Sequence, residues 1–490
     1  MSTIFDCERP EGIGGLFPAP DVPTKGQENL IPSSLLRELA PRIPCLSEPE
    51  LVRHYTRLSK LNYGVDDGFY PLGSCTMKYN PKINEDLVRL PGFAQAHPLA
   101  DEQLIQGCLK LLFEMSGLLS KVAGLADVTL QPAAGAHGEL TGMFLVKRYF
   151  EDRGEENRKR ILLPDSAHGT NPASAALSGF SVTEIPSGGD GMVNLAALEK
   201  ALDETVAAIM LTVPNTLGIF EERILEVTDM VHAAGGLCYF DGANLNAFLG
   251  RACPGDMGAD IFHFNLHKTL STPHGGGGPG AGPVAVAEQL VQFLPVPRIV
   301  KEDETYRFDW NYPQSIGCVH SFYGNFGVIL KAYAYLLHLG DEGLCAVSEN
   351  AVLNANYLQE RLKKTYRLPY DHLCKHEFVL SGKEIAEGIS TFDIAKRLID
   401  YGFHPPTIYF PLIVPEALMI EPTECEGKET LDRFIEAMEQ IAVEAKEAPQ
   451  LLHDAPQHAP VRRLDQTRAA RQPMLSYPFN DSADQEDQTS

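Results

Sequence analysis

The sequence predicts an α/β fold with a mostly parallel sheet, followed by a smaller C-terminal α/β domain. Apolar, β-branched runs alternate with helical patterns from about residue 125 onward. The runs span residues 160–165, 206–214, 236–241 and 259–265, and the helical patterns span 138–150, 193–203 and 221–234. Strands that alternate with helices form crossover units, which place successive strands parallel in one sheet. Polar and small residues follow several of these runs, at the carboxyl ends where such sheets bind ligands.

The chain before the sheet consists of an arm and a helix. Residues 1–45 are rich in Pro and Gly and show no sustained period, which predicts an extended arm that needs another surface to pack on. A helix is predicted to follow, because Ser47 and Glu50 have the spacing of a capping box. The next segment, FYPLGSCTMKYNPK, is polar and aromatic and is predicted to be a loop.

The rest of the chain is predicted to form two domains and a tail. Residues 46–310 are assigned to the large domain, which includes the helix near its start. Long helical patterns at 324–339 and 348–365 then replace the alternation, so residues 311–450 are assigned to a smaller domain. Residues 451–490 are polar and nearly aperiodic, which predicts a disordered tail.

Composition and charge exclude several classes of function. The 490 residues carry 41 Lys and Arg against 65 Asp and Glu, a net charge of −24, which disfavours nucleic acid and anionic membranes as partners. The ten cysteines include no C-x-x-C pair, so a reducing compartment is expected. The sequence shows no signal peptide and no apolar run of about 18 residues. We therefore expect a cytoplasmic protein.

Lys268 is the first candidate catalytic residue. It follows the predicted strand 259–265 and precedes the glycine run 275–278. A lysine at a strand exit can form a Schiff base, and neighbouring glycines leave room for a bulky cofactor. A lysine in a flexible surface loop explains the same window, and the window alone favours that alternative.

Asp241 strengthens the case for Lys268. It ends the apolar run 236–241, one predicted strand earlier in the chain. Alone, such an aspartate is as readily a helix cap or a metal ligand. Together, the two residues supply what pyridoxal phosphate needs, which is a lysine for its aldehyde and a carboxylate for its pyridine nitrogen.

A third candidate element precedes the predicted helix 138–150. Gly135, Ala136 and His137 lead into this helix, where free backbone N–H groups bind phosphate. His137 would then lie flat on a cofactor ring. The alternative is a helix-capping loop with a solvent-facing histidine. When this segment is considered by itself, the alternative is favoured.

Two further polar segments follow strands that open on the same cleft. His168 follows the run 160–165 and could face substrate, and Asn215 or Thr216 follows the run 206–214 and could bind a cofactor hydroxyl. Turn formation and capping explain these residue types equally well. His263 and His267 lie at a strand end, where their spacing does not put them on one face, so no metal site is predicted.

These segments resemble a known family. The resemblance rests on AAGAHGE, DSAHGTNPASA, TVPNTLGIFE, FDGANLNA and HFNLHKTLSTPHGGGGPG, in this order, with FYPLGSCTMKYNPK upstream. They look like the pyridoxal-phosphate half of glycine decarboxylase, the P-protein of the glycine cleavage system. The similarity extends from about residue 45 to about residue 440.

The resemblance implies a fold-type I pyridoxal-phosphate enzyme. Lys268 would bind the cofactor covalently, Asp241 would hold the pyridine nitrogen, and His137 would stack on the ring opposite Ala243. The implied catalytic residues are Lys268, His137 and His168. The implied cofactor-binding residues are Lys268, Asp241, His137, Ala243, Gly135, Ala136, Thr216 and His267.

The implied activity is an oxidoreductase step on glycine. Glycine loses CO₂, and its aminomethyl group passes to the lipoyl arm of the carrier called H-protein. The chain is similar to subunit 2 of this enzyme, so a subunit 1 partner is expected, with two copies of each. Another fold-type I enzyme acting on a small amino acid and a non-catalytic subunit of such a complex are the alternatives.

Overall fold

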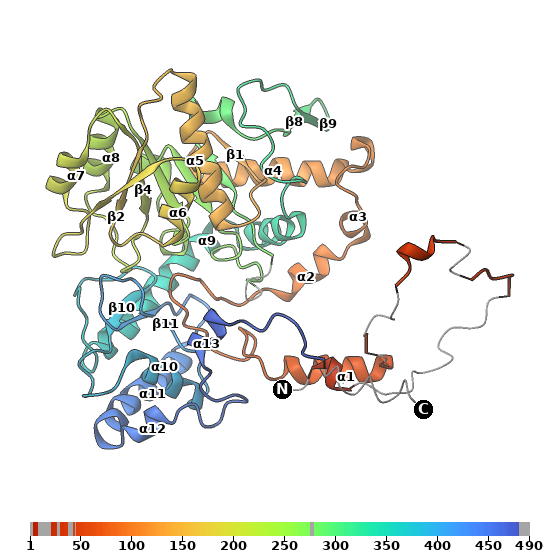
Figure 1. Cartoon of the computed structure of the whole chain (residues 1–490). Helices are drawn as coiled ribbons and strands as arrows, with labels where there is room; N and C mark the ends of the chain where they lie inside the picture. The colour runs from red at the N-terminus through yellow and green to blue at the C-terminus, as the bar shows by residue number, and fades with distance from the viewer. Residues whose placement is uncertain are drawn as a thin grey trace. The chain divides into compact units, whose positions relative to one another are not determined.

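The computed structural model describes residues 3–7, 21–26, 30–37, 43–44, 46–274 and 279–479 (Figure 1). The described residues fall into two compact units. The first is drawn from residues 1–63 and 460–490, and the second from residues 64–459. Most of the predicted N-terminal arm, the glycine run 275–278 and the last part of the predicted tail lie outside the described residues.

The first unit contains short helical elements. They are η1 (Ile4–Cys7), η3 (Ser33–Leu35), α1 (Glu48–Ser59) and α13 (Gln466–Arg471). The predicted capping box at the start of α1 is confirmed, because the Ser47 N–H donates to Glu50 Oε2 at 3.0 Å. Helix α13 lies in the stretch predicted to be disordered, where the Asp465 carboxylate caps it by accepting from the Arg468 N–H at 2.9 Å.

The second unit is built on a seven-stranded sheet in the order β1-β7-β6-β5-β4-β2-β3. The strands are β1 (Asp127–Thr129), β2 (Arg160–Pro164), β3 (Ser181–Ile185), β4 (Val206–Thr212), β5 (Leu237–Gly242), β6 (Ile261–Phe264) and β7 (Val284–Val286). Strands β3, β2, β4, β5 and β6 run parallel to one another. Strand β7 is antiparallel to both β6 and β1. The predicted mostly parallel sheet is therefore confirmed, with an antiparallel strand near one edge.

Helices cover both faces of this sheet (Figure 1). Tyr239 and Ile261 share a core with α5 (Gly135–Asp152) and α6 (Thr170–Leu177). Phe240 and Phe262, their neighbours in sequence, share the opposite core. That second core includes α4 (Gln106–Ala123), α7 (Leu195–Ala201), α8 (Ile224–Ala233) and α9 (Phe326–Leu362). Because successive side chains point to opposite faces, strands covered on both sides are apolar throughout. This burial explains the continuous apolar runs.

A smaller antiparallel sheet, in the order β10-β12-β11, forms the C-terminal part of the same unit. Its strands are β10 (Phe378–Ser381), β11 (Thr407–Ile408) and β12 (Ala417–Ile420). They pack with α10 (Thr391–Asp400), α11 (Lys428–Glu447) and α12 (Gln450–His453) around a separate hydrophobic core. Helix α9 leads into this part, and it breaks at Gly340, where φ is 59°. The boundaries at residues 310 and 450 stay predictions.

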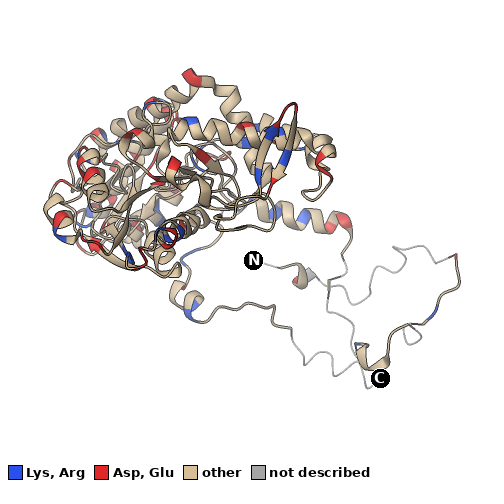
Figure 2. Cartoon of the chain, turned by 90° about the horizontal axis from the view of Figure 1, so that it is seen from above, with Lys and Arg blue, Asp and Glu red and all other residues tan. Residues whose placement is uncertain are grey.

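The remaining elements connect these parts. They are α2 (Lys82–Val88), α3 (Pro91–Ala94), η4 (Glu102–Leu104), η5 (Leu245–Ala247), η6 (Pro254–Met257), η7 (Glu288–Phe293) and the hairpin of β8 (Arg298–Glu302) and β9 (Thr305–Asp309). Acidic and basic residues are interspersed along the helices in Figure 2. Within the described chain, no helix is both long and apolar enough to span a membrane.

Candidate active site

A cavity of about 470 Å³ lies at the carboxyl ends of β4, β5 and β6. Thr212, Asp241 and His263 come from the ends of these strands, and Thr407 and Phe410 come from the C-terminal part. The other lining residues are Gly73, Ser74, Cys75, Ala134, Gly135, Ala136, Glu139, His168, Thr170, Ala243, Asn265, His267, Lys268 and His274. Its position is the one expected for a ligand of a parallel sheet, and its volume suits a small molecule.

Lys268 reaches this cavity from the turn after β6. Its N–H donates to the Asn265 carbonyl at 3.0 Å, which closes that turn. The side chain is only 9% exposed, and Nζ donates to the Ser74 carbonyl at 3.0 Å. The amine is thus held at the cavity by a single neutral acceptor among the described residues. This arrangement leaves it available for chemistry once that hydrogen bond is released.

Asp241 lies on β5, the neighbour of β6 in the sheet, and is fully surrounded by protein. Its Oδ1 accepts from the Ala243 N–H at 2.9 Å and lies 3.3 Å from Nε2 of His263, which is its register partner on β6. Burial opposes ionisation, but His263, Lys268 and the Ala243 N–H outweigh it and lower the pKa of Asp241. Tyr239 fixes the other His263 nitrogen, with its hydroxyl 2.6 Å from Nδ1. The carboxylate is therefore charged and rigidly oriented.

The amino end of α5 forms a third side of the cavity. Ala134, Gly135 and Ala136 line the cavity, and no side chain among the described residues caps this 18-residue helix. The first N–H groups of a helix have no partner within it, so such an end binds anions. A Cβ on Gly135 would lie 2.2 Å from Oδ1 of Asn265, which explains the glycine.

Three cavity histidines, His168, His267 and His274, are neutral near pH 7. Burial, reinforced by Lys268 and His274, lowers the pKa of His267 to about 3. Burial also lowers the pKa of His168 and of His274. Two neighbours orient His168. Thr170 Oγ1 lies 2.9 Å from His168 Nδ1, and the ring centre of Phe410 lies 5.8 Å from that of His168.

The structure brings most of the predicted site residues together. Those that line the cavity are Lys268, Asp241, His168, Ala243, Gly135, Ala136 and His267. Two predicted residues, His137 and Thr216, are not among the described lining residues of the cavity. His137 Nδ1 instead accepts from the Ala133 N–H at 3.1 Å, and its ring centre lies 6.2 Å from that of His320.

The roles predicted for His137 and Thr216 stay predictions, and the structure places both side chains off the cavity lining. Each residue of a helix turns by about 100°, so His137 points away from the direction shared by Ala136 and Glu139. Thr216 is fully buried, and its hydroxyl donates to the Ser166 carbonyl. Neither side chain is placed to contact a group bound in the cavity, whereas His168 is.

Sequence reasoning missed several wall residues. Glu139 lies one helical turn after Gly135, a spacing that could have revealed it, and accepts from Thr170 and Ser174 at 2.7 and 3.0 Å. Burial, followed by repulsion from Asp241, raises the pKa of Glu139. Loop residue Cys75 has Sγ 2.9 Å from Nε2 of His274, a contact between distant segments that no local pattern reveals.

The donor set accommodates pyridoxal phosphate. A lysine, a charged aspartate and an uncapped helix start meet at one cavity, matching the aldehyde, pyridine nitrogen and phosphate of the cofactor. Thr212 Oγ1, on the same wall, is a buried hydroxyl with no hydrogen-bond partner among the described residues. Glu139, Asp241 and His263 each offer an atom that could bind a metal ion, and these atoms lie within 4.8 Å of one another. Each residue also has hydrogen-bond partners within the protein.

Comparisons with known proteins agree with one another. The profile of a family described as glycine cleavage system P-protein matches residues 26–306, and that of the glycine dehydrogenase C-terminal domain matches 347–460. A relative from Caldanaerobacter subterraneus subsp. tengcongensis, named probable glycine dehydrogenase (decarboxylating) subunit 2, is 57% identical over 477 residues, covering 97% of this chain and 98% of its own. A relative of the same name from Halalkalibacterium halodurans is 56% identical over 478 residues, covering 97% and 98%.

Solved structures share the fold. An inhibitor-bound glycine decarboxylase (P-protein) of the glycine cleavage system superposes with a TM-score of 0.71 at 23% identity, covering 85% of this chain and 95% of its own. A NifS-like protein superposes with a TM-score of 0.60 at 15% identity, covering 77% and 99%.

Proposed function

The chain belongs to the P-protein family of the glycine cleavage system, among the proteins named glycine dehydrogenase (decarboxylating) subunit 2, and from this premise we propose that Lys268 binds pyridoxal phosphate for the decarboxylation of glycine. The observation that carries the proposal is the meeting of Lys268, Asp241 and the α5 N-terminus at one cavity. Lys268 would attach the aldehyde, Asp241 would bind the pyridine nitrogen, and the N–H groups at Gly135 and Ala136 would hold the phosphate. Held by these residues, pyridoxal phosphate would supply an electron-withdrawing ring that weakens the bond to the glycine carboxylate.

The surrounding residues prepare this chemistry before glycine arrives. Asp241 is charged, so it stabilises a proton on the pyridine nitrogen, and His263 and Tyr239 hold its carboxylate in place. The neutral imidazoles of His168 and His267 offer hydrogen bonds without adding charge. Loop residues Ser74 and Cys75 line the cavity, with the Ser74 carbonyl at the amine of Lys268, where they would limit the entry of water.

The finer steps involve partners. We propose that the glycine carboxylate leaves as CO₂ and that its electron pair forms a bond from the remaining carbon to one sulfur of the lipoyl disulfide on H-protein. The second lipoyl sulfur takes a proton and becomes a thiol, so carbon is oxidised and the disulfide is reduced. A subunit 1 would complete the enzyme, with two copies of each subunit.

His168, rather than His137, is proposed to face the cofactor ring. We expect His168→Ala to weaken cofactor binding and to lower glycine turnover by roughly 100-fold, because it removes a cavity wall group that orients the reactants. His137→Ala should leave turnover within about threefold of the wild type, since its side chain points elsewhere. Cofactor titration and steady-state kinetics of the two variants test the assignment. A larger loss in His137→Ala would contradict it.

The proposed function is tested by isotope exchange. The chain is co-expressed with subunit 1, and exchange of the glycine carboxyl group with labelled CO₂ is measured with and without lipoylated H-protein. We expect exchange by the complex, and light scattering should show two copies of each subunit. Absence of exchange in a complex that holds pyridoxal phosphate would overturn the assignment of glycine decarboxylation. Full exchange by the isolated chain would overturn only the need for subunit 1.

A further inference from the structure

A loop of residues 71–80, here called loop 71–80, forms the wall of the cavity next to the reactive amine. Gly73, Ser74 and Cys75 line the cavity, and the Ser74 carbonyl accepts from Lys268 Nζ at 3.0 Å. Ser74 has φ of 62°, a conformation that a residue other than glycine rarely adopts. Such a conformation persists only where surrounding contacts impose it. Contacts with the surrounding segments therefore hold this loop in place.

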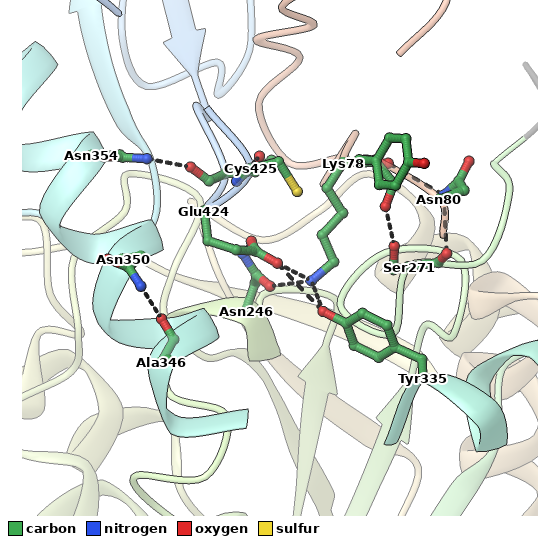
Figure 3. Close-up of polar contacts among 12 residues, drawn as sticks. Lys78, Asn80, Asn246, Ser271, Tyr335, Ala346, Asn350, Asn354, Glu424 and Cys425 are labelled. Atoms are coloured by element: carbon green, nitrogen blue, oxygen red, sulfur yellow. Dashed lines mark hydrogen bonds and ion pairs between the residues drawn. The ribbon is translucent and has the colours of Figure 1, made fainter. Parts of the chain in front are cut away.

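Lys78 anchors loop 71–80 through a buried side chain. The residue is only 3% exposed, and Figure 3 shows its side chain pointing into a group of polar side chains. Its Nζ donates to Asn246 Oδ1 at 3.1 Å, to the Tyr335 hydroxyl at 3.1 Å and to Glu424 Oε1 at 2.7 Å. An ammonium group has three donors, so all of them are used.

The three partners of Lys78 come from separate parts of the chain. Asn246 lies in η5 after β5, Tyr335 lies in α9, and Glu424 follows β12 of the C-terminal sheet. Asn246 Nδ2 also donates to Glu424 Oε2 at 3.2 Å. The ammonium of Lys78 therefore joins the loop, the large sheet and the C-terminal part at one point.

Other contacts tie the loop at both of its ends. The Ser74 N–H donates to Glu377 Oε2 at 2.6 Å, and Thr407 Oγ1 donates to the Gly73 carbonyl at 2.7 Å. Asn80 Nδ2 donates to the Ser271 carbonyl at 3.0 Å, close beyond Lys268 in the chain. Displacement of the loop would thus change the surroundings of the reactive amine directly.

The ion pair is poorly explained by stability alone. A buried pair of charges loses hydration, and well-packed apolar residues in its place are often as stable or more stable. Here burial disfavours the charged lysine, and Glu424 outweighs this effect and raises the pKa of Lys78. What apolar side chains cannot reproduce is the set of directed hydrogen bonds that fixes the position of the loop.

We propose that Lys78 is a positioning residue, which holds loop 71–80 so that Ser74 and Cys75 stand against the amine of Lys268. It is not a catalytic residue, because its side chain does not line the cavity. The inference rests on the proposed function in one respect, which is that the cavity is where glycine reacts. The position of the loop itself is a property of the protein without cofactor.

The test separates positioning from stability. Lys78→Met, Glu424→Leu and the double variant Lys78→Met/Glu424→Leu are compared with wild type and with Arg397→Met as a matched control. Arg397 is a suitable control because its Nε lies 2.8 Å from Glu444 Oε2, in a pair whose side chains are 14% and 12% exposed. The pair joins α10 to α11, and neither residue lines the cavity. Thermal midpoint, hydrogen exchange of peptides covering residues 71–80, and glycine turnover with subunit 1 are measured.

We expect each single variant at Lys78 or Glu424 to lower the thermal midpoint, because it leaves a buried charge unpaired. The double variant should recover most of that midpoint. Hydrogen exchange of loop 71–80 in the double variant should nevertheless remain at least tenfold faster than in wild type. The kcat of the double variant should be roughly 10- to 100-fold lower, because misplaced groups reduce turnover. Arg397→Met should lower the midpoint and change neither exchange in the loop nor kcat.

Recovery of loop protection and kcat together with the midpoint in the double variant would overturn the proposal, because the pair would then be purely structural. Wild-type exchange of the loop in Lys78→Met would overturn it as well. The exchange measurement uses the full chain without cofactor or glycine. Failure of the wild type to react with glycine would therefore refute the proposed function while the exchange result still decides the role of Lys78.

Discussion

Lys268→Ala is expected to abolish both the absorbance of the lysine-bound cofactor and the turnover of glycine, while the chain remains folded. Its Nζ donates one hydrogen bond, to the Ser74 carbonyl, and Lys268 is the lysine that lines the described part of the cavity. Loss of a covalent attachment point cannot be replaced by binding alone, so turnover should fall by at least about 10⁴-fold. Absorbance spectroscopy after incubation with pyridoxal phosphate and the exchange assay measure the two effects.

Lys159→Ala is the matched control for this substitution. Lys159 is exposed and lies just before β2, so its truncation should leave both absorbance and turnover unchanged. Circular dichroism should show the same secondary structure for both variants. If Lys268→Ala keeps the absorbance of a covalently bound cofactor, another lysine carries it and the site has been misassigned.

Asp241→Asn is expected to retain the cofactor and to lose most of its activity. The substitution keeps the size of the side chain but removes the charge that stabilises a proton on the pyridine nitrogen. Asp241 is 2% exposed and its pKa is lowered despite burial, so the wild-type group is charged where the ring would bind. Loss of a preorganised charge of this kind costs roughly 100- to 1,000-fold in turnover. Cofactor titration and steady-state kinetics distinguish binding from turnover.

Asp260 offers the control for this second substitution. It is 5% exposed and accepts from the Cys238 N–H and from Gln289 Nε2, both at 2.7 Å, but it does not line the cavity. Asp260→Asn should therefore lower stability without changing turnover per folded molecule. Near wild-type turnover in Asp241→Asn would show that Asp241 serves only to cap the Ala243 N–H.

The predicted residues that line the cavity from β5 and β6 stand at or just beyond the ends of these strands. Asp241 ends an apolar run that is buried on both faces, and the turn of Lys268 follows the next apolar run. Adjacent parallel strands end at the same edge, so their last residues must meet. The register of β5 and β6, which pairs Asp241 with His263, required the structure.

The cavity lining depends on helix rotation and on contacts between distant segments, which a local pattern does not reveal. His137 differs from Ala136 by one step of the helix, which is enough to turn it away from the cavity. In loop 71–80, Ser74 contacts Lys268, which lies 194 residues further along the chain. Lys78 contacts Glu424, which lies 346 residues further along the chain. Local composition marked this loop as polar and could not reveal what it covers. Strand β7 was missed because it is short, Val284–Val286, and antiparallel to its neighbours.

Borohydride reduction followed by peptide mapping identifies the lysine that carries the cofactor. The purified chain is incubated with pyridoxal phosphate, reduced, digested and analysed by mass spectrometry. Reduction fixes the cofactor irreversibly to the lysine that carries it. We expect one modified peptide, with the pyridoxyl group on Lys268. A pyridoxyl group on any other lysine, or none on Lys268, would contradict it.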